Sequence, residues 1–167
     1  AELRTYLGGI GLQMNISKLA SILFASNYNE RRLGKIKIEV EGFQLITADH
    51  IPFLGVKLDK QSKFEEFISQ KVSKIYSILA VFRRYKHLPF ITRKTMAMSF
   101  IFPVIDYSNV LLLNATKWNI SRLNRALNST LRFIFNAKYK SKITYLRKRL
   151  HVLDVDSRII FKMHSLI

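Results

Sequence analysis

Apolar residues recur every three or four positions through the middle of the chain, and this spacing is the strongest constraint on its fold. The spaced residues are Phe64, Ile68, Val72, Ile75, Leu79 and Phe82. On an α-helix such positions share one face, so a helix of about twenty residues that buries this face is predicted. A second helix is predicted over Lys117–Asn136, with another apolar row along it. That row consists of Leu123, Leu127, Leu131 and Ile134. Helices with one apolar face must pack together, so this part of the chain is predicted to be a helical bundle.

The residues before Lys60 follow a different pattern. Lys35–Val40 alternates polar and apolar side chains, which is typical of a half-buried strand. Two more strands are predicted over Lys18–Ser26 and Ile51–Leu58, the latter with Gly55 inside it as a bulge or a point of close backbone approach. The predicted fold class is therefore α+β: a small antiparallel sheet followed by a mostly helical bundle.

The distribution of charged residues changes near Lys60, where the pattern of apolar residues also changes. Residues 1–60 contain 8 Lys+Arg and 6 Asp+Glu, whereas residues 61–167 contain 20 and 5, so nearly all of the net charge of +17 lies in the second part. Two domains are predicted, 1–60 and 61–167. A net charge of this size on a chain that is 49% hydrophobic indicates a polyanionic partner, either nucleic acid or an anionic membrane surface.

Several kinds of chemistry are excluded or disfavoured by residue types. The chain has no cysteine, which excludes disulfides, thiol catalysis and cysteine–zinc sites and fits an intracellular location, nuclear or cytoplasmic. The four histidines have no metal-ligand spacing. Asp154 and Asp156 could hold magnesium, but they precede a predicted helix, so capping is favoured. Asp106, alone in an apolar run, is interpreted as a cap or a buried ion-pair partner.

Basic residues on the predicted helices are candidates for contact with phosphate groups. Four basic residues of the first helix are interpreted as lying largely off the apolar stripe. They are Lys71, Lys74, Arg83 and Arg84. On the second, a row on the opposite side is formed by Arg122, Arg125 and Arg132. No Asp or Glu occurs between Tyr107 and Leu153, so local acids do not neutralise this row. The residues could follow a phosphate backbone, or they could form an ordinary solvated face.

Basic residues and tyrosines alternate after the second helix. The basic candidates there are Lys138, Lys140, Lys142, Arg147 and Arg149, interleaved with Tyr139 and Tyr145. This combination suits phosphate neutralisation together with stacking on a base or sugar. The alternative is that the tyrosines only cover the hydrophobic core.

Two segments resemble a known family when they are considered together. Gly11–Lys18 (GLQMNISK), followed by Ile22–Phe24, resembles the GLxLNxxK segment of reverse transcriptases from non-LTR (LINE-type) retrotransposons. Ile51–Asp59 (IPFLGVKLD) resembles the YLGVxLD segment of the same family, with Phe53 in place of the usual tyrosine. Segments 64–88, 102–107 and 150–167 resemble the thumb of that family and its downstream connection.

The resemblance implies roles for residues in both segments. The first would be polymerase motif D, in which Lys18 would help pyrophosphate to leave; without the family, Lys18 is interpreted as a solvated lysine before a strand. The second would be motif E, the primer grip, a tight hairpin that holds the 3′ end of the primer. Phe53, Leu54 and Gly55 would form its turn.

The catalytic aspartates of the family belong to other motifs, and this chain contains no Asp-Asp pair. Two-metal phosphoryl transfer needs carboxylates that hold both ions. The segment alone is therefore expected to be inactive and to carry no cofactor, with Mg²⁺ only in the full-length parent enzyme. The implied partners are RNA, DNA or an RNA–DNA hybrid, together with the remaining palm and fingers, and no membrane.

Two rival interpretations remain. The chain could be a stand-alone basic nucleic-acid-binding helical module, a domesticated or remnant piece of a retroelement. It could instead be a protein-interaction or membrane-surface domain, which is disfavoured because tryptophan is limited to Trp118 and the basic residues do not border one exposed apolar face.

Overall fold

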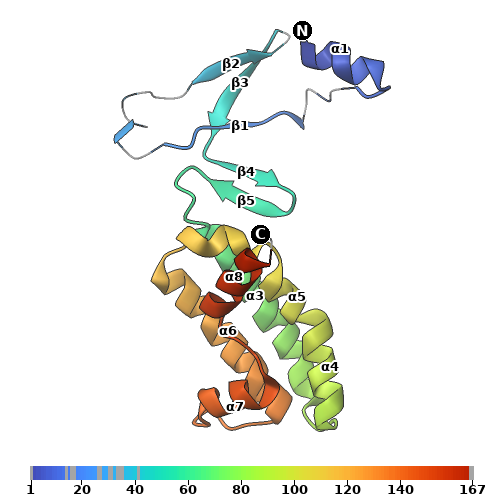
Figure 1. The fold of residues 1–167 in the computed structure, drawn as a ribbon, viewed down its shortest axis with the longest axis vertical. Helices are drawn as coiled ribbons and strands as arrows, with labels where there is room; N and C mark the ends of the chain where they lie inside the picture. Colours follow the sequence, from blue (N-terminus) through green and yellow to red (C-terminus); the bar gives the residue numbers. More distant parts are fainter. Residues whose placement is uncertain are drawn as a thin grey trace. The chain divides into compact units, whose positions relative to one another are not determined.

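The computed structural model describes residues 2–13, 15, 18–25, 28–29, 32, 36–40 and 42–165. The chain forms two compact units, Ala1–Gln61 and Ser62–Ile167. The boundary between the units lies one residue from the boundary predicted from the apolar pattern and the charge distribution. All described strands belong to the first unit and most of the helix to the second, so the fold is α+β (Figure 1).

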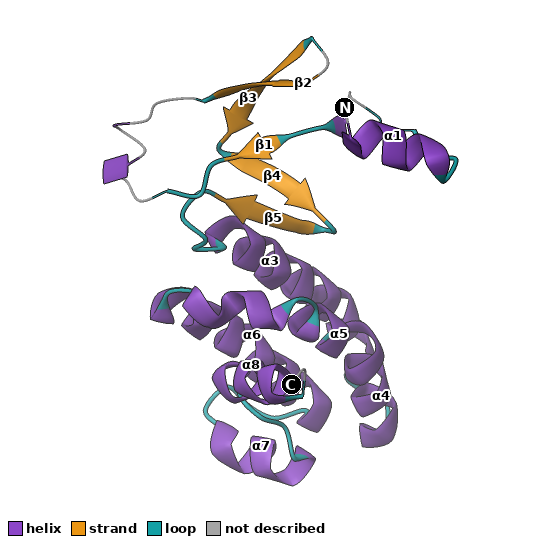
Figure 2. Cartoon of the chain, turned by 45° about the horizontal axis from the view of Figure 1, so that its top comes forward, coloured by secondary structure: helices purple, strands orange, loops and turns teal. Residues whose placement is uncertain are grey.

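In the described part of the first unit, the elements with given bounds are helix α1, a three-stranded sheet and a hairpin. Their bounds are α1 Glu2–Gly9, β1 Ser21–Ile22, β2 Lys37–Val40, β3 Phe43–Ala48, β4 His50–Phe53 and β5 Val56–Asp59. In the sheet, β3 is central, with β2 antiparallel to it and β1 parallel (Figure 2). The parallel pair differs from the antiparallel sheet that was expected.

Helix α1 continues through two glycines. Gly8 and Gly9 both remain helical, and the chain leaves the helix at Gly11, which has a left-handed φ of 72°. The N–H of Leu12 donates to the carbonyl of Leu7 over 2.9 Å and closes the last turn. The terminating glycine is therefore the one in the left-handed conformation, as helix C-termini usually require.

The segment Ile51–Leu58 is a hairpin, and its prediction as a single strand was wrong. Phe53 pairs with Val56, so Leu54 and Gly55 form a two-residue turn. Both have positive φ, 47° and 74°, which is the type I′ geometry whose twist suits a hairpin. Phe53 is the last residue of β4, so the turn consists of Leu54 and Gly55 and not of the three residues that the resemblance implied.

The other predicted strands are shorter in the structure. The predicted strand 18–26 reduces to Ser21–Ile22 among the described residues, and Ser26 and Lys35 lie outside them. Strand β3 was not predicted. The side chain of Ile38, expected on a buried face, is 42% exposed.

The second unit is a bundle of helices. Their bounds are α3 Glu65–Phe82, η2 Arg83–Tyr85, α4 Phe90–Phe100, α5 Phe102–Asp106, η3 Asn109–Asn114, α6 Lys117–Phe135, α7 Ile143–Leu150 and α8 Val155–His164. Helix α6 contacts α3, α4, α7 and α8. It runs in the same direction as α3, so the C-terminal ends of these two helices lie at the same end of the bundle (Figure 1).

The predicted apolar rows form the core of this unit. On α6, the four predicted core residues Leu123, Leu127, Leu131 and Ile134 have no exposed surface. On α3, Ile68 and Ile75 are equally buried, whereas Val72 is partly exposed.

Polar side chains and prolines set the ends of these helices. Thr116 accepts from the N–H of Asn119 over 3.3 Å at the start of α6, and Asn136 ends that helix with a left-handed φ of 49°. Pro89 is the N-cap residue of α4. Pro103 lies in the first turn of α5, and α4 ends before it at Phe100, because a proline cannot continue a preceding helix.

No described helix combines the length and the hydropathy of a membrane span.

Leu127→Ala is expected to lower the free energy of unfolding by about 2–5 kcal/mol, because it leaves a cavity in the centre of the bundle. Leu113→Ala is the matched control, since the side chain of Leu113 is 48% exposed. Urea unfolding followed by far-ultraviolet circular dichroism measures both variants. Equal losses in the two variants would contradict the central position of α6.

Candidate nucleic-acid interface

The site residues expected in the first unit are exposed. The side chains of Phe53 and Leu54 at the hairpin tip are 57% and 78% exposed, and Gly55 beside them is also exposed. Lys18 precedes β1 and is exposed, and its N–H donates to the carbonyl of Asn15 over 3.1 Å. Met14, Ile16 and Ser17 of the motif D-like segment lie outside the described residues.

Lys71 is buried, so its assignment as a nucleic-acid contact was wrong. The residue is only 4% exposed. Its ammonium donates to the carbonyls of Ile105 and Tyr107, over 3.2 Å and 2.5 Å, and to Oδ1 of Asn109 over 3.4 Å. The position explains this: Lys71 is three residues after Ile68 and four before Ile75, which places it on the buried face of α3.

Burial lowers the pKa of Lys71 to about 8, and the negative charge of Asp106 partly opposes this change. The lysine joins α3 to the end of α5, where the backbone leaves the helix and its carbonyls need donors. Its role in this structure is to hold the bundle together.

Asp106 is part of the same polar cluster. Its carboxylate accepts two hydrogen bonds from the guanidinium of Arg158 on α8, one of them from Nε over 2.8 Å, and a third from Asn109 over 3.3 Å. The interpretation of Asp106 as an ion-pair partner is confirmed. This cluster joins α5, η3 and α8.

Two more of the predicted contact residues are used inside the bundle. Arg122 donates to Oγ of Ser69 on α3 over 3.0 Å and lies over the ring of Trp118, with 4.7 Å between Cζ and the ring centre. Arg147 donates to Asn128 over 2.9 Å and forms an ion pair of 3.3 Å with Asp154. Both guanidinium groups are half-buried and are hydrogen-bonded to residues of neighbouring helices, so they are poorly placed to bind a polyanion.

Asp154 caps α8, as favoured from the sequence. Its carboxylate accepts the N–H of Ser157 over 2.9 Å. This hydrogen bond lowers the pKa of Asp154, and the charge of Arg147 lowers it further. Among the described residues, no three His, Cys, Asp or Glu side chains lie close enough together to hold a metal ion.

Most of the predicted contact residues are nevertheless exposed. They are Lys74, Arg83, Arg84, Arg125, Lys138, Lys140, Lys142 and Arg149. The acids Asp106 and Asp154 are paired with arginines, and α6 and α7 contain no acid at all. The exposed cations on these two helices and their connection are therefore not neutralised by acids of the same elements.

Tyrosines accompany this basic surface. The side chains of Tyr139 and Tyr145 are 85% and 61% exposed, which excludes the alternative that they cover the core. Arg132 is half-buried, and its Cζ lies 5.0 Å from the ring centre of Tyr139. Such cation–π contact restrains the ring. An exposed, restrained ring beside lysines is suited to stacking on a nucleotide.

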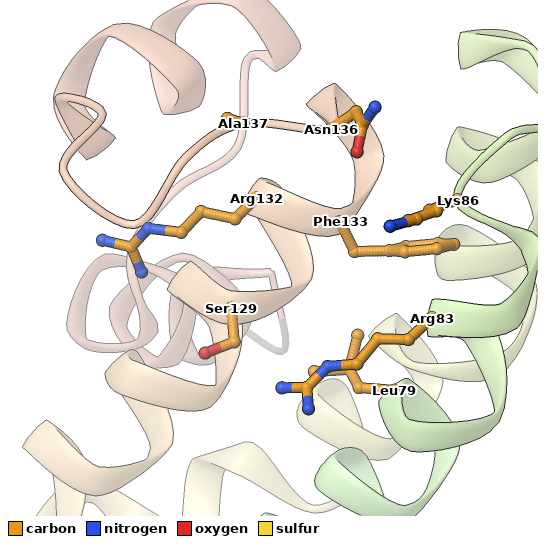
Figure 3. A pocket seen from close by; sticks show the side chains of 8 residues that line it. All are labelled: Leu79, Arg83, Lys86, Ser129, Arg132, Phe133, Asn136 and Ala137. Atoms are coloured by element: carbon orange, nitrogen blue, oxygen red, sulfur yellow. The ribbon is translucent and has the colours of Figure 1, made fainter.

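A pocket of about 220 Å³ lies where α3–η2 meets the end of α6 (Figure 3). It is lined by Leu79, Arg83, Lys86, Ser129, Arg132, Phe133, Asn136 and Ala137. Arg83 extends from η2 toward α6, whereas Arg132 extends away from Arg83 (Figure 3). Lys86 and Ser129 were not predicted, because only tertiary packing brings η2 beside α6.

Comparison of the chain with protein-family models, curated proteins and solved structures finds no match.

Lys71→Met tests the buried lysine through the pH dependence of stability. The folded pKa of about 8 lies below the value of 10.5 for a solvated lysine, so between these values the unfolded chain binds one more proton than the folded chain. Raising the pH through this interval therefore favours the folded wild type. We expect the free energy of unfolding of wild type, minus that of the variant, to be constant near neutral pH and to increase between about pH 8 and 10.5.

Urea unfolding at a series of pH values measures this difference, and the titration of tyrosines cancels because both proteins contain them. A difference that stays flat up to pH 10.5 would show that burial does not perturb the ionisation of Lys71.

Proposed function

We propose that the helical unit binds the sugar–phosphate backbone of nucleic acid. One observation carries the proposal: exposed lysines and arginines accumulate on α6, α7 and their connection, where no acid occurs. A nucleic-acid backbone supplies closely spaced negative charges, and neutralising them releases condensed counterions. Such binding requires a row of accessible cations and no catalytic group.

We further propose that the chain is the palm edge and thumb of an RNA-directed DNA polymerase. The two motif-like segments support this, and so does the exposed hairpin formed by the second of them. In this proposal the tip residues Phe53, Leu54 and Gly55 contact the 3′ end of a primer, and Lys18 lies near the incoming nucleotide. The carboxylates and Mg²⁺ for catalysis belong to the rest of the parent enzyme.

A salt titration with two nucleic acids tests both proposals. The ligands are an RNA–DNA hybrid with a recessed 3′ end and a plain DNA duplex, and fluorescence anisotropy gives the binding constant. We expect tighter binding of the hybrid and a steep linear fall of log K with log salt, because each neutralised phosphate contributes about −0.9 to the slope.

Charge variants identify the binding surface. Arg125→Gln and Lys140→Gln are each expected to make the slope shallower by about one. Lys37→Gln is the matched control, because Lys37 is exposed but belongs to the first unit. Equal affinity for both ligands would favour the stand-alone basic module, and a folded chain that binds neither would contradict nucleic-acid binding.

Leu54→Asn tests whether the hairpin acts through its backbone shape or through the side chain of Leu54. Asparagine followed by glycine suits the left-handed positions of a type I′ turn better than leucine does. We expect slower amide hydrogen exchange in β4 and β5, together with a weaker preference for the recessed 3′ end. An unchanged preference would show that the side chain of Leu54 does not contact the primer terminus.

A further inference from the structure

The pocket at the joined ends of α3 and α6 has the chemistry of an anion site. Arg83 and Lys86 line it, and both are exposed. Neither side chain forms a hydrogen bond or an ion pair with any other residue in the described part of the chain. The lining contains a hydroxyl and an amide but no carboxylate. The two cations are therefore available to an external anion.

Two helix C-termini meet here, and their partial negative charges oppose anion binding. Each terminus is equivalent to roughly −0.5 charge, so together they offset about half of the two full positive charges. Two carbonyls at the end of α6 are also already occupied: Asn136 and Ala137 donate to the carbonyls of Phe133 and Arg132, over 3.1 Å and 2.9 Å. The side chains of Arg83 and Lys86 are thus not needed to cap α6.

The interior of the pocket strengthens the attraction. Leu79 and Phe133 in its lining are only 2% and 9% exposed, and apolar surroundings raise the energy of charge–charge interaction. The volume of about 220 Å³ lies below the roughly 300–1,000 Å³ of pockets that enclose whole small molecules. The pocket therefore suits a single charged group.

We propose that this pocket binds one phosphate group of a nucleic-acid strand, with Arg83 and Lys86 as its ligands. The assignment of the phosphate to a strand rests on the proposed function, because it is the exposed cations of α6 and α7 that would bring a strand to this unit. The pocket would then fix the position of the strand on the bundle, whereas the flexible surface lysines supply attraction without position.

Substitutions in the pocket and at one exposed lysine outside it test the proposal in the whole chain. Arg83→Gln and Lys86→Gln are each expected to weaken binding of the RNA–DNA hybrid about tenfold, because each removes a charge-assisted hydrogen bond. Lys162→Gln is the control: it removes one charge from an exposed residue of α8 that neither lines the pocket nor belongs to the predicted contact residues, and a change of about twofold or less is expected. Circular dichroism verifies that each variant is folded.

Inorganic phosphate is the second probe. We expect it to shift the NMR amide signals of Asn136 and Ala137 in the wild type and in Lys162→Gln, but not in Arg83→Gln. The same tenfold loss of hybrid binding in Arg83→Gln and Lys162→Gln would overturn the strand assignment, even with the amide shifts present. Absence of those shifts in the wild type would overturn the anion site itself. A wild type that shows the shifts but binds no nucleic acid would refute the proposed function and leave only a site for free phosphate.

Discussion

The burial of one face of α6 is the constraint on which the helical unit depends. Leu123, Leu127, Leu131 and Ile134 have no exposed surface, and the helix contacts α3, α4, α7 and α8. Because helical positions are fixed relative to one another, this burial also determines which basic residues of the helix can face outward. Arg125 is exposed for this reason, whereas Arg122 lies at the edge of the contact with α3 and is bound there. The hydrophobic core thus decides which charges are available for binding.

Elements with long and regular patterns of apolar residues were predicted best from the sequence. Helices α3 and α6 were predicted closely because their apolar rows extend over several turns. The hairpin β4–β5 was interpreted from its residues as one strand because its turn is Leu-Gly, which lacks the Asn-Gly signal of a type I′ turn. Strand β3 was missed because Leu45 and Ile46 are adjacent, so the segment does not alternate. Short elements whose partners lie elsewhere carry too little local information.

The candidate site was predicted less well than the fold, for two physical reasons. Lys71 was assigned to the surface because of its charge, although its spacing from Ile68 and Ile75 places it on the buried face. A buried ammonium is tolerated there because backbone carbonyls surround it. The pocket could not be predicted at all, since Arg83 and Lys86 meet the end of α6 only through packing of the bundle. Residue type identifies the chemistry of a site, but tertiary structure selects the residues that share it.

Several arginines of this unit hold its helices together, as the buried Lys71 does. Arg93, Arg147 and Arg158 donate to carbonyls, amides or carboxylates within the bundle. The lysines of the α6–α7 connection are exposed. Guanidinium is less strongly hydrated than ammonium and offers several donors in one plane, so it satisfies fixed acceptors at a lower desolvation cost. Some of the positively charged side chains therefore hold the helices together. The excess of 20 basic over 5 acidic residues in 61–167 thus overstates how many phosphates the unit can neutralise. In the proposed binding of nucleic acid, the accessible cations alone would determine that number, and with it the dependence of affinity on salt.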